Sequence, residues 1–186
     1  KVALTLSAVG LAATVFLVGR ERGDGLSLSG LDFGGDGGLR LANPQFTGRT
    51  PDGAPFSVSA EWALPDGPDP ERVELGPVSG EARLAGDRTA FLEASGGEAR
   101  PKEETLTLGG GVTLRSSDGY VLKVDNAMLR LREQLLEAAG PVEGLAPFGD
   151  LSAGSMRAAR IDESNYIWFE DGVRVRIDPE RAAKRG

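Results

Sequence analysis

The sequence predicts an antiparallel all-β domain of the sandwich, jellyroll or barrel type. Apolar and polar residues alternate along short stretches, most clearly over residues 55–62, which gives a strand one apolar face. Turn dipeptides separate these stretches, as at Asp52-Gly53, where glycine accepts a positive φ without a Cβ clash. The chain of 186 residues contains 27 glycines and 11 prolines, which suits many short strands better than long helices.

One hairpin pattern occurs more than once. Residues 43–62 form two extended stretches joined at Asp52-Gly53, and the same Arg-x-x-Asp-Gly spacing returns over residues 115–119. Further turn signals are Gly86-Asp87, Gly149-Asp150 and Asp171-Gly172. We therefore expect consecutive hairpins whose turns depend most on Gly53, Gly119 and Gly149.

The composition disfavours several classes of function. The net charge is −7 and the isoelectric point is near 4.8, so nucleic-acid binding, which needs a basic surface, is not expected. The chain has no cysteine and no histidine, which removes thiolate metal sites and the commonest general base. Acidic pairs such as Asp66/Asp69 and Glu103/Glu104 lie in turn-rich sequence, where carboxylates are usually solvated. We expect no enzymatic activity, no metal site and no cofactor.

The N-terminal run over residues 2–19 contains no charged residue and is flanked by Lys1 and Arg20. Its length suits a transmembrane helix, so residues 1–20 are predicted to be a single-span anchor. A cleaved signal peptide is the main alternative, but the run lacks an Ala-x-Ala cleavage site. A buried core helix is a third interpretation. The glycine-rich residues 21–38 are predicted to be a flexible linker, and residues 179–186 a basic tail.

Residues 39–178 are predicted to be the β domain. Pro44 interrupts the first strand, and because proline cannot donate to a ladder, that strand is expected at an edge or with a bulge. Residues 64–70 and 96–104 are expected to be loops. The predicted strands are 39–49, 55–62, 72–75, 78–85, 89–94, 105–108, 111–115, 120–125, 142–146, 149–153, 156–161, 166–170 and 173–178.

Residues 127–139 have two possible interpretations. Local propensity favours a helix over this stretch. Leu129 and Leu131 nevertheless alternate with charged or longer side chains, and strands are predicted on both sides. We favour two strands joined by a turn near Glu133-Gln134.

Three motif groups occur in a characteristic order. They are Asn43-Pro44-x-Phe46-x-Gly48-Arg49-x-x-Asp52-Gly53, then Gly111-Val112-x-Leu114 with Asp118-Gly119-Tyr120-x-Leu122, and then Gly140-Pro141-Val142-x-Gly144-x-x-Pro147-Phe148-Gly149-x-Leu151-x-Ala153. In this order the chain resembles the LptC family of lipopolysaccharide export proteins, in the form found in alphaproteobacteria. The resemblance covers nearly the whole chain apart from the linker and the tail.

The resemblance implies an antiparallel β-jellyroll of the LptA/LptC/OstA-like type, with an apolar interior and one N-terminal transmembrane helix. It implies an inner-membrane protein whose soluble domain lies in the periplasm. Such a protein receives lipopolysaccharide from the ABC transporter containing LptF and LptG and passes it to the bridge protein LptA. Docking would occur by β-strand addition, since exposed strand edges offer unpaired N–H and C=O groups.

On this resemblance two sets of residues are expected to form the functional surfaces. The lipid groove is expected to be lined by Phe46, Phe56, Val58, Trp62, Leu114, Tyr120, Leu122, Val124, Phe169 and Val175. The edge strands facing the transporter and LptA are expected to contain Leu39, Leu41, Phe46, Tyr166, Trp168, Val173, Val175 and Ile177. A closed β-sandwich that acts only as an envelope scaffold remains an alternative, and an enzyme using an acidic pair is a third.

Overall fold

The computed structural model describes residues 31–33, 39–49, 54–67, 69–84, 87–130, 132–133, 135–161 and 164–179. These residues form fifteen strands that pair in antiparallel fashion into one sheet. The strands are β1 (Leu31–Phe33), β2 (Leu39–Ala42), β3 (Gln45–Arg49), β4 (Pro55–Ala60), β5 (Trp62–Pro65), β6 (Val73–Leu75), β7 (Val78–Arg83), β8 (Thr89–Arg100), β9 (Thr105–Ser116), β10 (Val121–Val124), β11 (Ala127–Arg130), β12 (Leu135–Ala146), β13 (Gly149–Ile161), β14 (Ser164–Glu170) and β15 (Arg174–Ile177).

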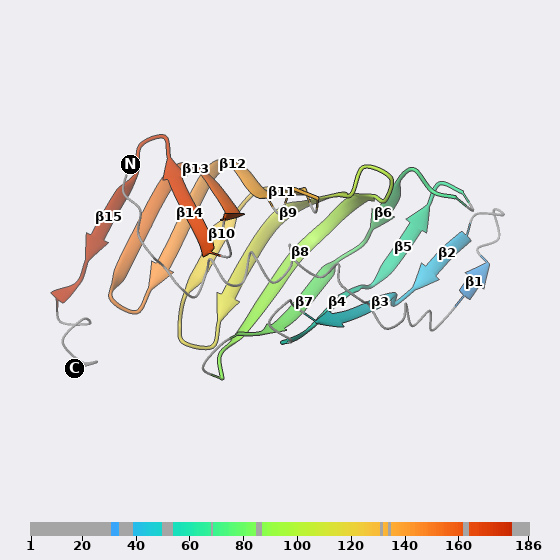
Figure 1. The fold of residues 1–186 in the computed structure, drawn as a ribbon, viewed down its shortest axis with the longest axis horizontal. Coiled ribbons are helices and arrows are strands. Elements are labelled where there is room, and N and C mark those ends of the chain that lie inside the picture. Colours follow the sequence, from blue (N-terminus) through green and yellow to red (C-terminus); the bar gives the residue numbers. More distant parts are fainter. Residues whose placement is uncertain are drawn as a thin grey trace.

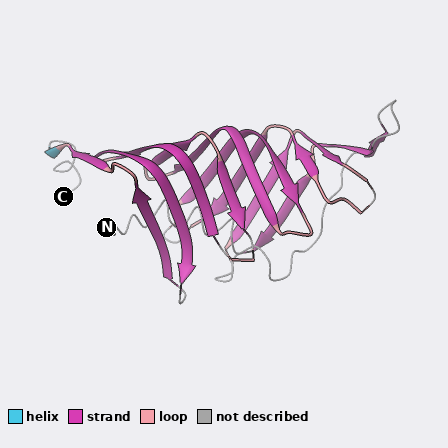
Figure 2. Ribbon diagram, turned by 90° about the horizontal axis from the view of Figure 1, so that it is seen from above, coloured by secondary structure: helices cyan, strands magenta, loops and turns pink. Residues whose placement is uncertain are grey.

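The sheet is divided into two layers by a line of strand breaks. Layer 1 contains β3, β4, β7, β10 and β15, together with residues 89–94 of β8, 112–116 of β9, 142–146 of β12 and 149–153 of β13. Layer 2 contains β1, β2, β5, β6, β11 and β14, together with the other halves of the four long strands. The layers extend from β1 and β3 at one end of the molecule to β14 and β15 at the other (Figure 1). Seen from above, one set of strands lies in front of another (Figure 2).

Glycines and bulges allow the long strands to pass from one layer to the other. The register of β8 shifts between Ala94 and Gly96, and that of β12 shifts between Ala139 and Val142. In β9, Gly110 and Gly111 have φ values of 73° and 89°, which residues with a Cβ rarely adopt. A Cβ on Gly110 would also lie 2.7 Å from the Cβ of Ser95. These positions bend each strand without ending it.

The core lies between the two layers. It is one cluster of buried apolar side chains drawn from both layers, with Leu108 and Val142 the largest that are almost completely enclosed. Several inward positions are alanines, including Ala90 and Ala158, which are fully buried. Small side chains let the layers approach closely, and the enclosed Leu108 and Val142 show that the interior between them is packed by protein atoms.

The all-β antiparallel prediction is confirmed. Strand β11 (Ala127–Arg130) and the start of β12 (Leu135–Ala146) flank a turn at residues 132–133, as favoured over the helix, and the first strand breaks at Pro44 into β2 and β3. Asn43, just before that break, has a positive φ of 49°. β3 pairs with β4 in the register expected for that hairpin, although its Asp52-Gly53 turn lies outside the described residues.

Several strand boundaries were predicted wrongly. Residues 96–100 are not a loop but the second half of β8, and the strands predicted over 149–153 and 156–161 are one strand, β13. The prediction treated glycine-rich positions as strand ends, whereas the structure uses them as bends within strands. Residues 31–33 of the predicted linker form β1, which pairs with β2. The predicted anchor over residues 1–20 lies outside the described residues, among which no helix is long and apolar enough to cross a membrane.

Candidate functional site: an apolar hollow between the layers

An apolar hollow lies at the end of the molecule formed by β14 and β15. Its floor is made by β10, β12 and β13 of layer 1, and Phe169 of β14 reaches it from layer 2. The cavity volume is about 40 Å³, and the empty space between its walls is about 470 Å³ when the open mouth is included. The hollow is therefore shallow and open, and a long ligand would lie along it rather than inside a closed tunnel.

The hollow lies where three neighbouring positions of the floor have little or no side chain. These are Gly144 and Ala146 on β12 and Gly149 on β13, where Ala146 pairs with Gly149 and Gly144 pairs with Leu151. Gly149 is also required by its neighbours, because a Cβ there would lie 2.0 Å from the carbonyl oxygen of Arg176 on β15. Gly149 therefore allows β15 to pack against β13, since a Cβ there would meet the β15 backbone and not the hollow.

Aromatic side chains form the rim. The rings of Tyr120 and Phe148 meet edge to face with centroids 6.2 Å apart, which is a favourable aromatic geometry. Phe169 packs against the core from the opposite layer. The walls of the hollow are apolar, so covering them with a hydrocarbon chain removes apolar surface from water and is favourable.

Four residues predicted to line a lipid groove meet at this hollow, namely Tyr120, Leu122, Phe169 and Val175. Phe56, Leu114 and Val124 point inward but are buried in the packed core, and Val58 is half-buried against it. Phe46 lies on β3, where it is 36% exposed and its ring contacts that of Phe56 at 5.8 Å. The residues predicted to line one groove therefore lie in three places, namely the hollow, the packed core and strand β3.

Trp62 was predicted to lie in the groove, and this is wrong. The apparent alternation from Phe56 to Trp62 is interrupted at Glu61, where the chain leaves β4 in layer 1 and enters β5 in layer 2. Ala63 is the next inward residue, at 3% exposure, so Trp62 lies on the outer face. There the guanidinium of Arg40 lies 5.2 Å from the centre of the Trp62 ring.

The predicted edge strands are only partly edges. Leu39 and Leu41 lie on β2, which has β1 on one side and β5 on the other, so β2 is an interior strand. Phe46 lies on β3, for which β4 is the one partner among the described residues. At the other end, Tyr166 and Trp168 lie on β14, whereas Val175 and Ile177 lie on β15 and Val173 just before it; both strands pair with β13 alone among the described residues.

The prediction missed several residues that shape the hollow, namely Gly144, Ala146, Phe148 and Leu151. Gly144, Phe148 and Leu151 are named positions of the last motif group, so the sequence contained a signal for these three, whereas Ala146 falls on an unspecified position of it. A glycine or alanine at an inward position of a strand indicates either close packing or a gap, and the sequence does not distinguish the two.

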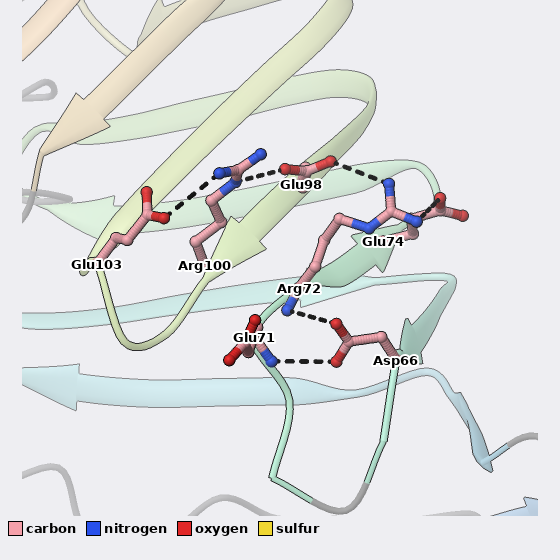
Figure 3. A network of polar contacts seen from close by, with 7 residues as sticks. All are labelled: Asp66, Glu71, Arg72, Glu74, Glu98, Arg100 and Glu103. Atoms are coloured by element: carbon pink, nitrogen blue, oxygen red, sulfur yellow. Dashed lines mark hydrogen bonds and ion pairs between the residues drawn. The ribbon is translucent and has the colours of Figure 1, made fainter.

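Polar networks lie on the outer face, away from the hollow. Asp66 accepts a hydrogen bond from the backbone N–H of Arg72, and the Arg72 guanidinium is 3.6 Å from the Glu98 carboxylate (Figure 3). Arg100 bridges Glu98 at 2.8 Å and Glu103 at 3.3 Å. The hydrogen bond from Arg100 is the main reason that the pKa of Glu98 lies below its usual value. These groups are exposed, so they stabilise the sheet weakly.

A second polar cluster holds the turn between β9 and β10. Burial acts to raise the pKa of Asp118, but hydrogen bonds from the Ser116 hydroxyl and the Arg88 guanidinium hold it below its usual value. Gly119 follows with a φ of 94°, which the turn requires. This cluster is structural. Among the described residues, no group of three or more acidic, histidine or cysteine side chains is placed to bind a metal ion.

Comparisons with protein-family models and with curated proteins found no match to the chain.

Proposed function

We propose that this chain is a non-enzymatic lipopolysaccharide transport component of the LptC type, with an open β-jellyroll that holds acyl chains. The observation that supports this most strongly is the apolar hollow, which joins the inner faces of both layers beside two edge strands, β14 and β15. Each methylene that leaves water contributes about 0.8 kcal/mol, so even a partial groove favours a lipid tail. On this proposal the domain lies in the periplasm and is held by an inner-membrane anchor.

The two ends of the sheet suit two partners. At one end β3 has a free edge among the described residues, and at the other end β14 and β15 do. A further strand can add to each edge by backbone hydrogen bonds. We propose that the β3 end contacts the transporter containing LptF and LptG and that the β14–β15 end contacts LptA. The apolar inner face would then continue from one protein into the next.

One observation favours the alternative of a closed scaffold. The middle of the interior is tightly packed, with Leu108 and Val142 almost completely enclosed. A lipid passing along the whole interior would need the layers to separate there. A scaffold that only mediates protein contacts would need no such separation.

Site-specific photo-crosslinking in cells that make lipopolysaccharide separates the two. A photoreactive residue replaces Leu122, which points inward and is 3% exposed, or its neighbour Lys123, which points outward. The transport proposal predicts lipopolysaccharide adducts at position 122 and few at position 123. A folded, membrane-bound protein without adducts at 122 would contradict transport and favour the scaffold.

A further inference from the structure

The two faces of β15 differ in chemistry beside the hollow. Val175 pairs with Leu151 and Ile177 pairs with Gly149, so these two apolar side chains share the inner face of layer 1. Arg174 and Arg176 alternate with them and lie on the outer face. All four residues are exposed, and β15 has a free edge among the described residues. One edge strand thus presents an apolar side to the hollow and a basic side to solvent.

These two arginines form no ion pair within the described part of the chain. Asp150 is the cross-strand partner of Arg176 and Ser152 that of Arg174, but neither arginine forms an ion pair with any described residue. Some arginines elsewhere in the sheet are paired, such as Arg115, which lies 2.6 Å from Glu93. Two free guanidinium groups beside an apolar hollow are complementary to a ligand with a hydrocarbon tail and an anionic head. Guanidinium groups suit phosphate in particular, since they donate in a planar fork.

We propose that the hollow takes one acyl chain of an anionic amphiphile and that Arg174 and Arg176 bind its phosphate head around the free edge of β15. This assignment rests on the proposed transport function and adds an orientation to it. The tail lies on the floor at Leu122 and Gly144, and the head points toward the end of the molecule that carries β15. The residues that hold the head are then next to the edge at which a partner strand would add.

The test uses the full chain in nanodiscs of zwitterionic lipid and two probes with the same diazirine-bearing decyl tail. One probe has a phosphate head and the other a neutral maltoside head. Mass spectrometry measures how much of each probe labels the peptides that line the hollow, as a function of probe concentration. In the wild-type protein we expect half-saturation at a lower concentration for the phosphate probe.

The variants test binding of the head group and binding of the tail separately. The double variant Arg174→Gln/Arg176→Gln is expected to raise the half-saturating concentration of the phosphate probe about three- to tenfold, the range for two exposed charge contacts, and to leave the maltoside probe unchanged. Arg83→Gln, which removes an exposed arginine on β7, is the matched control and should change neither. Ala146→Leu, which fills the hollow, should reduce labelling by both probes.

Two results would contradict the proposals in different ways. If the double variant binds the phosphate probe as the wild type does while Ala146→Leu still blocks both tails, the head assignment is wrong and the lipid-binding hollow stands. If neither probe labels the hollow of the folded wild-type protein, lipid binding itself is contradicted, and the proposed function with it.

Discussion

Replacing Gly149 by alanine tests how the hollow and the edge strand depend on one residue. A Cβ at this position would lie 2.0 Å from the carbonyl oxygen of Arg176, 3.0 Å from its carbonyl carbon and 3.1 Å from the Cα of Ile177. These are backbone atoms, so no rotamer change relieves the contact. Overpacking of this kind costs about 1–3 kcal/mol when the structure must absorb it.

The structure indicates where the strain will be released. The four residues of β15 are exposed and pair with β13 alone among the described residues, so the strand contributes little buried area. Its backbone hydrogen bonds stabilise it by only about 0.5–1.5 kcal/mol each, offset by the entropy of ordering the strand. We therefore expect Gly149→Ala to detach β15 from the sheet while the core stays folded.

Hydrogen–deuterium exchange measures this directly. The amides of β15 should lose protection, whereas those of the buried strands β9 and β12 should keep it. The melting temperature should fall by no more than about 2–4 °C for each kcal/mol of strain. Gly67→Ala is the matched control, since a Cβ at that position would have no atom within 4 Å beyond its chain neighbours, and it should leave both readouts unchanged. Full protection of β15 in Gly149→Ala would refute the reasoning.

Three further substitutions probe the bends, the core and the turn. Gly110→Ala should lower the unfolding free energy by about 1–3 kcal/mol, because φ is 73° there, and urea denaturation would show it. Leu108→Ala should cost about 2–5 kcal/mol in the same assay, whereas the same change at the exposed Leu145 should be nearly neutral. Asp118 has a lowered pKa in the folded state, so its contribution to stability is present above its ordinary pKa of 3.8 and is lost as pH falls through the lowered value. Asp118→Asn should therefore be less stable than the wild type at neutral pH, with the difference shrinking in acid; a constant difference across that range would contradict the assignment.

Much of the fold followed from local patterns. Alternation predicted the strands because each strand has one face in the core, as along Leu122 and Val124. The prediction from alternation failed where the chain passes from one layer to the other. There the alternation of inward and outward residues shifts by one position. Phe56 and Ala60 are inward in β4, but in β5 the inward residue is Ala63 and not Trp62. That phase change depends on the pairing partners of each half-strand, which are distant in sequence.

The hollow was harder to predict than the strands. Its apolar lining residues, such as Leu122 and Val175, could be named because any inward apolar residue near an open end is a candidate. Its shape depends on Gly144 and Ala146, whose small side chains leave room above the floor, and on Gly149, which lets β15 pack beside it. Residues of this type also occur where layers pack tightly, as Ala158 does. Only the pairing of β12 with β13 shows that these three lie together at an unclosed end.

The most direct measurement is whether an acyl chain contacts the inner face. The deuterated full chain, with protonated methyl groups, would be studied in deuterated nanodiscs with a protonated anionic amphiphile, and NMR would record transfer of magnetisation between the two. We predict contacts from the acyl chain to the methyl groups of Leu122, Leu151 and Val175 at the hollow. Contacts confined to Leu64 and Met128, which are each 39% exposed and lie on the outer face, would contradict the lipid-binding interior.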